Sequence, residues 1–240
     1  MSSASSPEVR AAAVIVAGGS GRRMGGAVRK QYLELDGVSI LERAVRAFAH
    51  HLRIHQVVLV LPPDDVAAPP EWAVALGLRV VAGGAERGDS VWNGLTAVSR
   101  DVDYVVIHDG ARPFVPPGVV HDVLGAAPAA VIAAVPVTDT IKEVDGDGTI
   151  VGTPDRARLW QAQTPQGFPR AGLVRAYARA RAYGVAATDD AALYERYVGP
   201  VRVVMGSYRN LKVTRPDDLP VAEALALAAD AGRGEDSGTI

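Results

Sequence analysis

Five short apolar runs, rich in valine, isoleucine and alanine, recur along the first part of this chain, at residues 10–17, 56–61, 79–82, 104–108 and 129–136. Each run has the length and composition of a buried strand, and segments with helical features separate most of them. Strands that alternate with helices favour a layered α/β domain with a mainly parallel sheet. Ligands bind such sheets at the carboxyl ends of the strands, so we expect a site there.

The segments between the runs predict helices. Ser39 and Glu42 have the spacing of a capping box, so we expect a helix from there to about residue 49. A last helix should begin at Pro216, because proline suits the first turn of a helix. The other expected helices cover 65–77, where two prolines weaken the prediction, and then 89–98, 119–126, 170–183 and 188–197.

A more polar stretch interrupts this pattern at residues 138–156. Within it, residues 140–144 and 149–152 flank the sequence Asp-Gly-Asp-Gly, which is a hairpin signal. We therefore expect a β-arm that projects from the sheet, followed by an extended segment at 159–163.

The length of 240 residues suits one large domain or two small ones. A strand at 201–205 completes the expected elements. We expect one domain over residues 10–231, with disordered tails at 1–9 and 232–240.

The composition excludes several classes of function. The chain has no cysteine, which rules out disulfides, thiolate metal sites and a cysteine nucleophile. A net charge of −2 gives no basic field for nucleic acid, and the three tryptophans form no stacking ladder. No apolar run approaches the length of a membrane span, and residues 1–10 lack the pattern of a secretory signal. We therefore expect a cytoplasmic protein that binds neither nucleic acid nor membranes.

A glycine-rich loop at 18–30, GGSGRRMGGAVRK, directly follows the first expected strand. Backbone N–H groups in such a loop can approach phosphate oxygens closely. Four cations, Arg22, Arg23, Arg29 and Lys30, suit a polyanionic ligand. The loop is not a dinucleotide fingerprint, because a methionine takes the third glycine position, and it is not a P-loop, because no Gly-Lys-Ser/Thr follows. A surface turn with solvated charges is the alternative.

The fourth run ends in the sequence His-Asp-Gly-Ala-Arg-Pro. Asp109, at the end of this strand, can bind a metal ion or a ribose hydroxyl, and Arg112 can bind a phosphate with its forked guanidinium. The alternative is a capped strand end with a local ion pair. We expect His108 to be structural.

Lysine is scarce, which genomic base composition explains: Lys30, Lys142 and Lys212 are the only lysines among 25 Lys and Arg residues. The lysines that remain should mark places where the planar guanidinium of arginine fails. Lys30 ends the glycine-rich loop, and Lys212 lies at a junction between a strand and the last helix. Thr140 and Arg156 flank the arm, and alone they indicate only loop polarity.

Seven stretches of the chain, in family order from about residue 12 to 227, resemble the 2-C-methyl-D-erythritol 4-phosphate cytidylyltransferases of isoprenoid biosynthesis. They are VAGGSGRRMG with RKQYLELDG, VAGGAERGDSVWNGL, VIHDGARPFV, VPVTDTIKEV, LWQAQTPQGF, ATDDAALYE and NLKVTRPDDL. Any one stretch is weak, but seven in order are highly specific. Ribitol-5-phosphate cytidylyltransferases share much of this pattern and are the alternative.

The resemblance implies a Rossmann-like nucleotide-binding sandwich, CTP as co-substrate, a Mg²⁺-dependent reaction and a homodimer clasped by the arm. It assigns catalysis to Arg23 and Lys30, which match positions that stabilise the transition state, and to Arg156 and Lys212, which match positions that hold the methylerythritol phosphate. Asp109 is the protein ligand implied for Mg²⁺, which the phosphates of CTP would mostly hold. The nucleotide-binding positions match Ala17, Gly18, Gly19, Ser20, Gly21, Gly84, Ala85, Ser90 and Asp109, and further substrate-side positions match Asp109, Arg112 and Thr140.

Three positions depart from the family pattern. Ala85 stands where a polar residue is frequent, Thr138 where a basic residue is frequent and Gly110 where alanine is frequent. At Ala85 only backbone contacts to cytosine remain. In the implied reaction, a phosphate oxygen attacks the α-phosphorus of CTP and pyrophosphate leaves, so the enzyme must mainly position and neutralise two anions. A non-catalytic nucleotide-binding regulator is the remaining alternative. The presence of four charged site residues together argues against it: Arg23, Lys30, Asp109 and Lys212.

Overall fold

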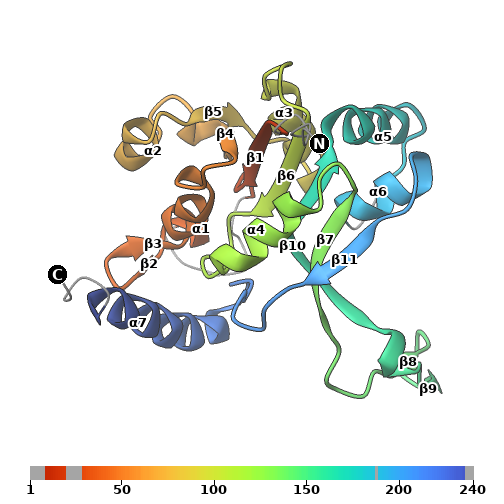
Figure 1. Cartoon of the computed structure of the whole chain (residues 1–240). Helices are drawn as coiled ribbons and strands as arrows, with labels where there is room; N and C mark the ends of the chain where they lie inside the picture. The colour runs from red at the N-terminus through yellow and green to blue at the C-terminus, as the bar shows by residue number, and fades with distance from the viewer. Residues whose placement is uncertain (1–8, 20–28, 187–188, 236–240) are drawn as a thin grey trace, which may run out of the picture.

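The computed structural model describes residues 9–19, 29–186 and 189–235. Its centre is a seven-stranded sheet in the order β11-β7-β10-β6-β1-β4-β5, with helices on both faces (Figure 1). Strand β10 is antiparallel to both of its neighbours, and the other pairs in this sheet are parallel. The mainly parallel α/β sheet is therefore confirmed. Its strands are β1 (Ala11–Val16), β4 (Ile54–Leu61), β5 (Arg79–Ala82), β6 (Tyr104–Asp109), β7 (Val131–Pro136), β10 (Trp160–Pro169) and β11 (Arg202–Met205).

Most helices lie where the sequence predicts them. The expected helix over 65–77 is wrong, because Pro69 and Pro70 disfavour a continuous helix and leave a short 3₁₀ turn, Pro63–Asp65, before a five-residue helix. The last helix is preceded by a 3₁₀ turn at Pro216–Asp218. The helices are α1 (Ile40–Ala49), α2 (Glu71–Ala75), α3 (Arg87–Ala97), α4 (Pro117–Gly125), α5 (Arg170–Ala182), α6 (Asp190–Tyr197) and α7 (Leu219–Glu235).

Both faces of the sheet are buried, which explains why its strands are continuous apolar runs rather than alternating ones. In β1, Ala12 and Val14 belong to the core under α3, α5 and α6. The intervening residues Ala11, Ala13 and Ile15 belong to the core under α1 and α4. The sheet thus places the end of β1 between two rigid layers.

A short hairpin precedes α1 and was not predicted. Its strands are β2 (Glu34–Leu35) and β3 (Val38–Ser39), joined by Asp36 and Gly37, which have φ values of 48° and 70°. These left-handed conformations are what an Asp-Gly hairpin turn requires. Leu35 packs in a third small core with residues of α7.

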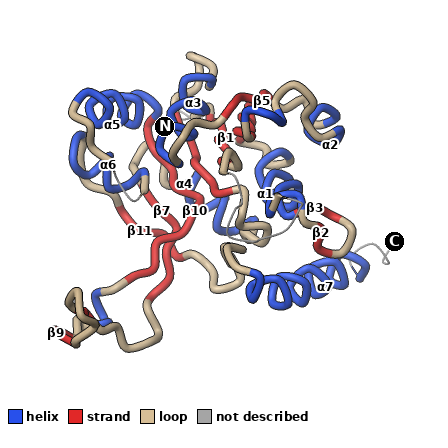
Figure 2. The backbone as a smooth tube through the Cα atoms, turned by 180° about the vertical axis from the view of Figure 1, so that it is seen from behind, coloured by secondary structure: helices blue, strands red, loops and turns tan. Residues whose placement is uncertain are grey.

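The arm is confirmed as a projecting hairpin. Its strands β8 (Glu143–Val144) and β9 (Ile150–Gly152) are antiparallel, and Gly148 between them has a φ of 82°. Figures 1 and 2 show the arm extending away from the body of the sheet, between the end of β7 and the start of β10. Of the extended segment expected at 159–163, residues 160–163 are part of β10, which continues to Pro169, and Leu159 follows a 3₁₀ turn.

The two ends of the chain lie partly outside the described residues, which exclude 1–8 and 236–240. Helix α7 ends at Glu235, so it runs into the segment 232–240 that we expected to be a tail. Among the described residues, no helix has the length and apolar character needed to cross a membrane.

Substitution of Gly94 should destabilise the fold. Gly94 lies where α3 packs on the sheet, and a Cβ there would be 2.4 Å from Cγ1 of Val14 and 2.8 Å from Cγ2 of Val60. We expect Gly94→Ala to lower the free energy of unfolding by about 1–3 kcal/mol, measured by urea denaturation. Gly118→Ala in α4 is the matched control, because nothing lies within 4 Å of its Cβ position. The control should stabilise the protein by about 0.5 kcal/mol, and equal effects of the two changes would contradict this packing.

Candidate active site

A pocket opens at the carboxyl ends of β1, β5 and β6, where the sequence predicts ligand binding. The loops after β1 and β5 form two of its walls, and the last residue of β6 and the segment before α7 form others. The pocket brings together nine predicted site residues: Ala17, Gly18, Gly19, Lys30, Gly84, Ala85, Ser90, Asp109 and Lys212.

Glycine is required where the two loops of the pocket meet. A Cβ on Gly18 would lie 2.9 Å from Oγ of Ser90 and 3.0 Å from Cα of Gly83. These distances are too short for any side chain. The close approach exposes backbone groups of both loops to the pocket, as expected of a site for a phosphorylated ligand.

Ser90 fixes the conformation of the second loop. Its Oγ accepts a hydrogen bond from the backbone N–H of Gly84 at 3.1 Å and donates one to the carbonyl oxygen of Glu86 at 3.2 Å. The side chain is almost fully buried, with 3% of the residue exposed. Its hydroxyl proton is therefore used within the loop.

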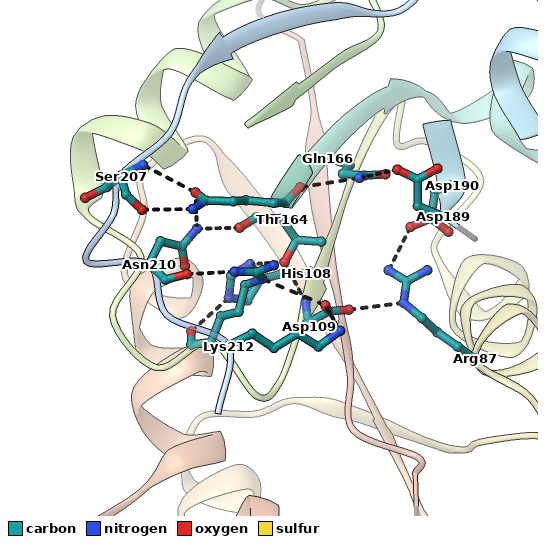
Figure 3. A network of polar contacts seen from close by, with 12 residues as sticks. Arg87, His108, Asp109, Thr164, Gln166, Asp189, Asp190, Ser207, Asn210 and Lys212 are labelled. Carbon is teal, nitrogen blue, oxygen red and sulfur yellow. Dashed lines mark hydrogen bonds and ion pairs between the residues drawn. The ribbon is translucent and has the colours of Figure 1, made fainter. Parts of the chain in front are cut away.

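Asp109, at the end of β6, lies among three cations (Figure 3). Its Oδ1 accepts from Nε of Arg87 at 3.1 Å, and its Oδ2 lies 2.7 Å from Nζ of Lys212 and 3.9 Å from Nε of Arg112. Burial alone would raise the pKa of Asp109, but the charges of Arg87 and Lys212 outweigh it and hold the pKa well below its ordinary value. The site thus contains a permanently ionised carboxylate.

The neighbouring histidine is structural, as the sequence predicts. His108 is fully buried, and its burial lowers its pKa to about 4, so the ring is neutral at pH 7. Nε2 faces the carbonyl oxygen of Arg112 at 3.1 Å and must carry the proton, which leaves Nδ1 to accept from Oγ1 of Thr164. Oγ1 of Thr164 in turn accepts from the backbone N–H of Asp109 at 3.0 Å. This chain of bonds fixes the turn that carries Asp109.

Strand β10 also holds the segment that carries Lys212. The amide of Gln163 donates to the carbonyl oxygen of Ser207 and accepts from its N–H. The buried Asn210 donates from Nδ2 to Oε1 of Gln163 at 3.2 Å and to the carbonyl oxygen of Thr164 at 2.8 Å. Figure 3 shows this network beside the ion pairs of Asp109. Lys212 is thereby directed toward the pocket from a rigid base.

Arg112 lies behind Asp109 rather than among the residues that line the pocket. Its side chain is 11% exposed, and Nη1 donates to the carbonyl oxygen of Asn210 at 2.7 Å. In this arrangement Arg112 joins the turn after β6 to the Lys212 segment.

The arm residues do not join the pocket of their own chain. Thr140 and Arg156 are exposed, and Nη1 of Arg156 donates to the carbonyl oxygen of Thr138 at 2.9 Å. Neither residue lines the pocket. Three other predicted site residues, Ser20, Gly21 and Arg23, lie outside the described residues.

A metal ion in this pocket would have two carboxylates within reach among the described lining residues. Among the described residues, no three Asp, Glu or His side chains gather to form a metal cage. Asp109 and Glu86 are the carboxylates among the described lining residues. Mg²⁺ in nucleotide sites is commonly held by one or two carboxylates with phosphate oxygens and water, and Asp109 fits that use.

Sequence reasoning missed Arg87 and Asp190 as site residues. Arg87 bridges Asp109 to the buried Asp190 of α6, where Nη2 donates to Oδ2 at 2.9 Å. Both residues lie within the quoted stretches VAGGAERGDSVWNGL and ATDDAALYE, but their pairing depends on the tertiary fold. One sequence feature could have indicated Asp190: it is the charged residue on the face of α6 that otherwise carries Leu193 and Tyr194.

The fold and the site define a class of protein: an α/β protein whose pocket, at the carboxyl ends of the strands, has the glycine loops and cations that suit a phosphorylated ligand. The glycine loops, the two lysines and the ionised Asp109 all face one pocket, and its described lining contains no histidine or cysteine. The family model IspD, described as 2-C-methyl-D-erythritol 4-phosphate cytidylyltransferase, matches residues 11–227. The chain belongs to this family and is therefore a nucleotidyltransferase.

Individual relatives of the chain carry the same description as the family model. The chain is 44% identical over 236 residues to the 2-C-methyl-D-erythritol 4-phosphate cytidylyltransferase of Pelotomaculum thermopropionicum, a match that covers 95% of this chain and 99% of the relative. It is 47% identical over 222 residues to that of Prochlorococcus marinus, covering 90% and 99%. The crystal structure of the Thermus thermophilus cytidylyltransferase matches with a TM-score of 0.78 at 36% identity, covering 91% of this chain and all of that one.

Proposed function

We propose that this chain transfers CMP from CTP to 2-C-methyl-D-erythritol 4-phosphate in the non-mevalonate isoprenoid pathway, and that the pocket at Asp109 is its active site. The supporting observation is the convergence of nine family-matched residues on that one pocket. Lys30 from the first loop and Lys212 from the segment before α7 both line it, so the charges needed to neutralise two anionic substrates are present.

The chemistry follows from this placement. A phosphate oxygen of the sugar phosphate attacks the α-phosphorus of CTP in line, and pyrophosphate leaves from the opposite side. We assign Lys30 and Arg23 to the charge that develops on the transferring group, and Lys212 to the sugar phosphate. Mg²⁺ held by Asp109 and the phosphates would supply further charge neutralisation. Ionised Asp109 pairs with Lys212 at the pocket, 2.7 Å from its Nζ.

The arm supports a homodimer in which each chain completes the site of its partner. Thr140 and Arg156 lie on an arm that projects away from the pocket of the same chain (Figure 1). The arm also carries the exposed apolar residues Val144, Ile150 and Val151. Apolar side chains on a projecting hairpin favour burial against another surface. We assign Thr140 and Arg156 to the methylerythritol phosphate of the partner's site, and we place the enzyme in the cytoplasm.

Ser90 should act on nucleotide binding through the loop that it holds. We expect Ser90→Ala to raise the KM for CTP about tenfold, because the N–H of Gly84 loses its acceptor and the loop loses its conformation. The effect on the CTP to UTP ratio should be smaller, since the hydroxyl already donates to Glu86. Steady-state kinetics with CTP and with UTP measures the KM and the ratio. Ser99→Ala, on an exposed loop, is the control, and an unchanged KM for CTP in Ser90→Ala would contradict the assignment.

The substrate is tested by measuring pyrophosphate release from CTP with methylerythritol phosphate and, separately, with ribitol 5-phosphate. Turnover with the first alone supports the proposed function. Turnover with the second alone would assign the chain to polyol-phosphate transfer. Binding of CTP without turnover on either acceptor would identify a nucleotide-binding regulator instead.

A further inference from the structure

Arg87, the first residue of α3, contacts two carboxylates at once. Its Nε donates to Oδ1 of Asp109 at 3.1 Å and its Nη2 donates to Oδ2 of Asp190 at 2.9 Å. Asp190 is fully buried, and its other oxygen accepts from the hydroxyl of Tyr177. The guanidinium is therefore held by Asp190 of α6 through Nη2 and pairs with Asp109 at the active site through Nε, as Figure 3 shows.

The two oxygens of Asp109 thus have partners of different kinds. Arg87 binds Oδ1 and is anchored in the protein by Asp190. Lys212 binds Oδ2 at 2.7 Å, and its side chain is 40% exposed at the pocket. Lys212 can therefore turn from Asp109 toward an incoming phosphate, whereas Arg87 has a second ion pair that holds it in place.

We propose that Arg87 is a positioning residue, which keeps the carboxylate of Asp109 paired so that Lys212 can be shared with the phosphate of the second substrate. A buried carboxylate that retains one charged partner loses less when another partner moves away. Without Arg87, Asp109 would keep only Lys212 and the more distant Arg112, 3.9 Å from Oδ2, so it would hold Lys212 more strongly and withhold it from the substrate. This inference rests on the proposed function, because it assigns Lys212 to the sugar phosphate.

The test must avoid leaving a buried charge without its partner. Arg87→Met alone would strand Asp190 in the core and is expected to unfold part of the chain. The double variant Arg87→Met/Asp190→Asn removes both charges, and the asparagine still accepts from Tyr177. We expect its KM for methylerythritol phosphate to rise about tenfold to a hundredfold. Its KM for CTP and its melting temperature should stay close to those of the wild type.

Three further variants separate positioning from other roles. Arg87→Lys/Asp190→Asn supplies one cation for one carboxylate and should recover most of the affinity for the sugar phosphate. Asp190→Asn alone keeps the Arg87–Asp109 pair and should show only a small rise in that KM. Tyr177→Phe leaves both ion pairs intact, so it should lower the melting temperature, because Asp190 loses a hydrogen bond, while both KM values stay unchanged.

Several outcomes would overturn the inference. A rise in the KM for CTP alone would show that Arg87 acts on the nucleotide directly. Unchanged constants in Arg87→Met/Asp190→Asn would show that the ion pairs only stabilise the fold, and an equal rise in Asp190→Asn would assign the effect to Asp190. Failure of the proposed function is distinguished beforehand, because the wild-type enzyme would then release no pyrophosphate with methylerythritol phosphate.

Discussion

Lys30→Ala is expected to lower kcat by about 10²–10³ while leaving the dissociation constant for CTP within about threefold of the wild type. The reason is that negative charge grows on the transferring group during the reaction, so a cation beside it contributes most in the transition state. Lys30, the first residue of a short 3₁₀ turn (Lys30–Tyr32), lines the pocket. Rapid-quench measurement of kcat, together with calorimetric titration of CTP, separates the two quantities.

Two comparison variants sharpen this result. Lys30→Arg should also be slow, because a planar guanidinium does not reproduce the compact charge of an ammonium. Arg10→Ala removes a cation near the opposite end of β1, where Arg10 pairs with Asp101 on the surface, and should leave kcat unchanged. Near-normal turnover in Lys30→Ala, or equal weakening of CTP binding and turnover, would refute the role in the transition state.

A mixture of inactive Lys30→Ala and inactive Arg156→Ala protein is expected to regain activity once subunits exchange. If each arm completes the partner's site, a heterodimer contains one site that carries both defects and one site that is intact. Random exchange makes about half of the dimers heterodimers, so about a quarter of the wild-type activity should return. Each variant alone should remain inactive at the same total concentration.

Subunit exchange must be followed independently, for example with two affinity tags or by native mass spectrometry. Two Lys30→Ala preparations with different tags form the control and should exchange without gaining activity. Verified exchange with no recovered activity would mean that each site lies within one chain and that the arm is only structural.

The fold was largely predictable because both faces of the sheet are buried. Continuous runs such as 56–61 and 104–108 are visible as strands without any partner being known. The failure at 65–77 has a local cause, since Pro69 and Pro70 divide that segment. The unpredicted hairpin also had a local signal, the dipeptide Asp36-Gly37, but its strands are only two residues long and do not stand out as apolar runs.

The site was predictable only in its lining. The residues that line the pocket follow strands or occur in short motifs, so their spacing is informative. The residues that hold these side chains in position show no such informative spacing. Arg87 reaches Asp109 across 22 positions and Asp190 across 103, and Gln163 reaches Asn210 across 47. No local pattern connects residues so far apart, because only the pairing of β10 with β6 and the packing of α3 and α6 on α5 bring them together.

The arm is joined to the antiparallel pair formed by β7 and β10, whose residues 160–162 lie opposite 136–134. The connecting segments 137–142 and 153–159 contain no strand, so the register of that pair does not extend into the hairpin. Two contacts join the segments at their base: the N–H of Val137 donates to the carbonyl oxygen of Leu159 at 3.0 Å, and Arg156 donates to the carbonyl oxygen of Thr138. An arm grafted from a relative must therefore reproduce these contacts at its base, whatever the length of its hairpin.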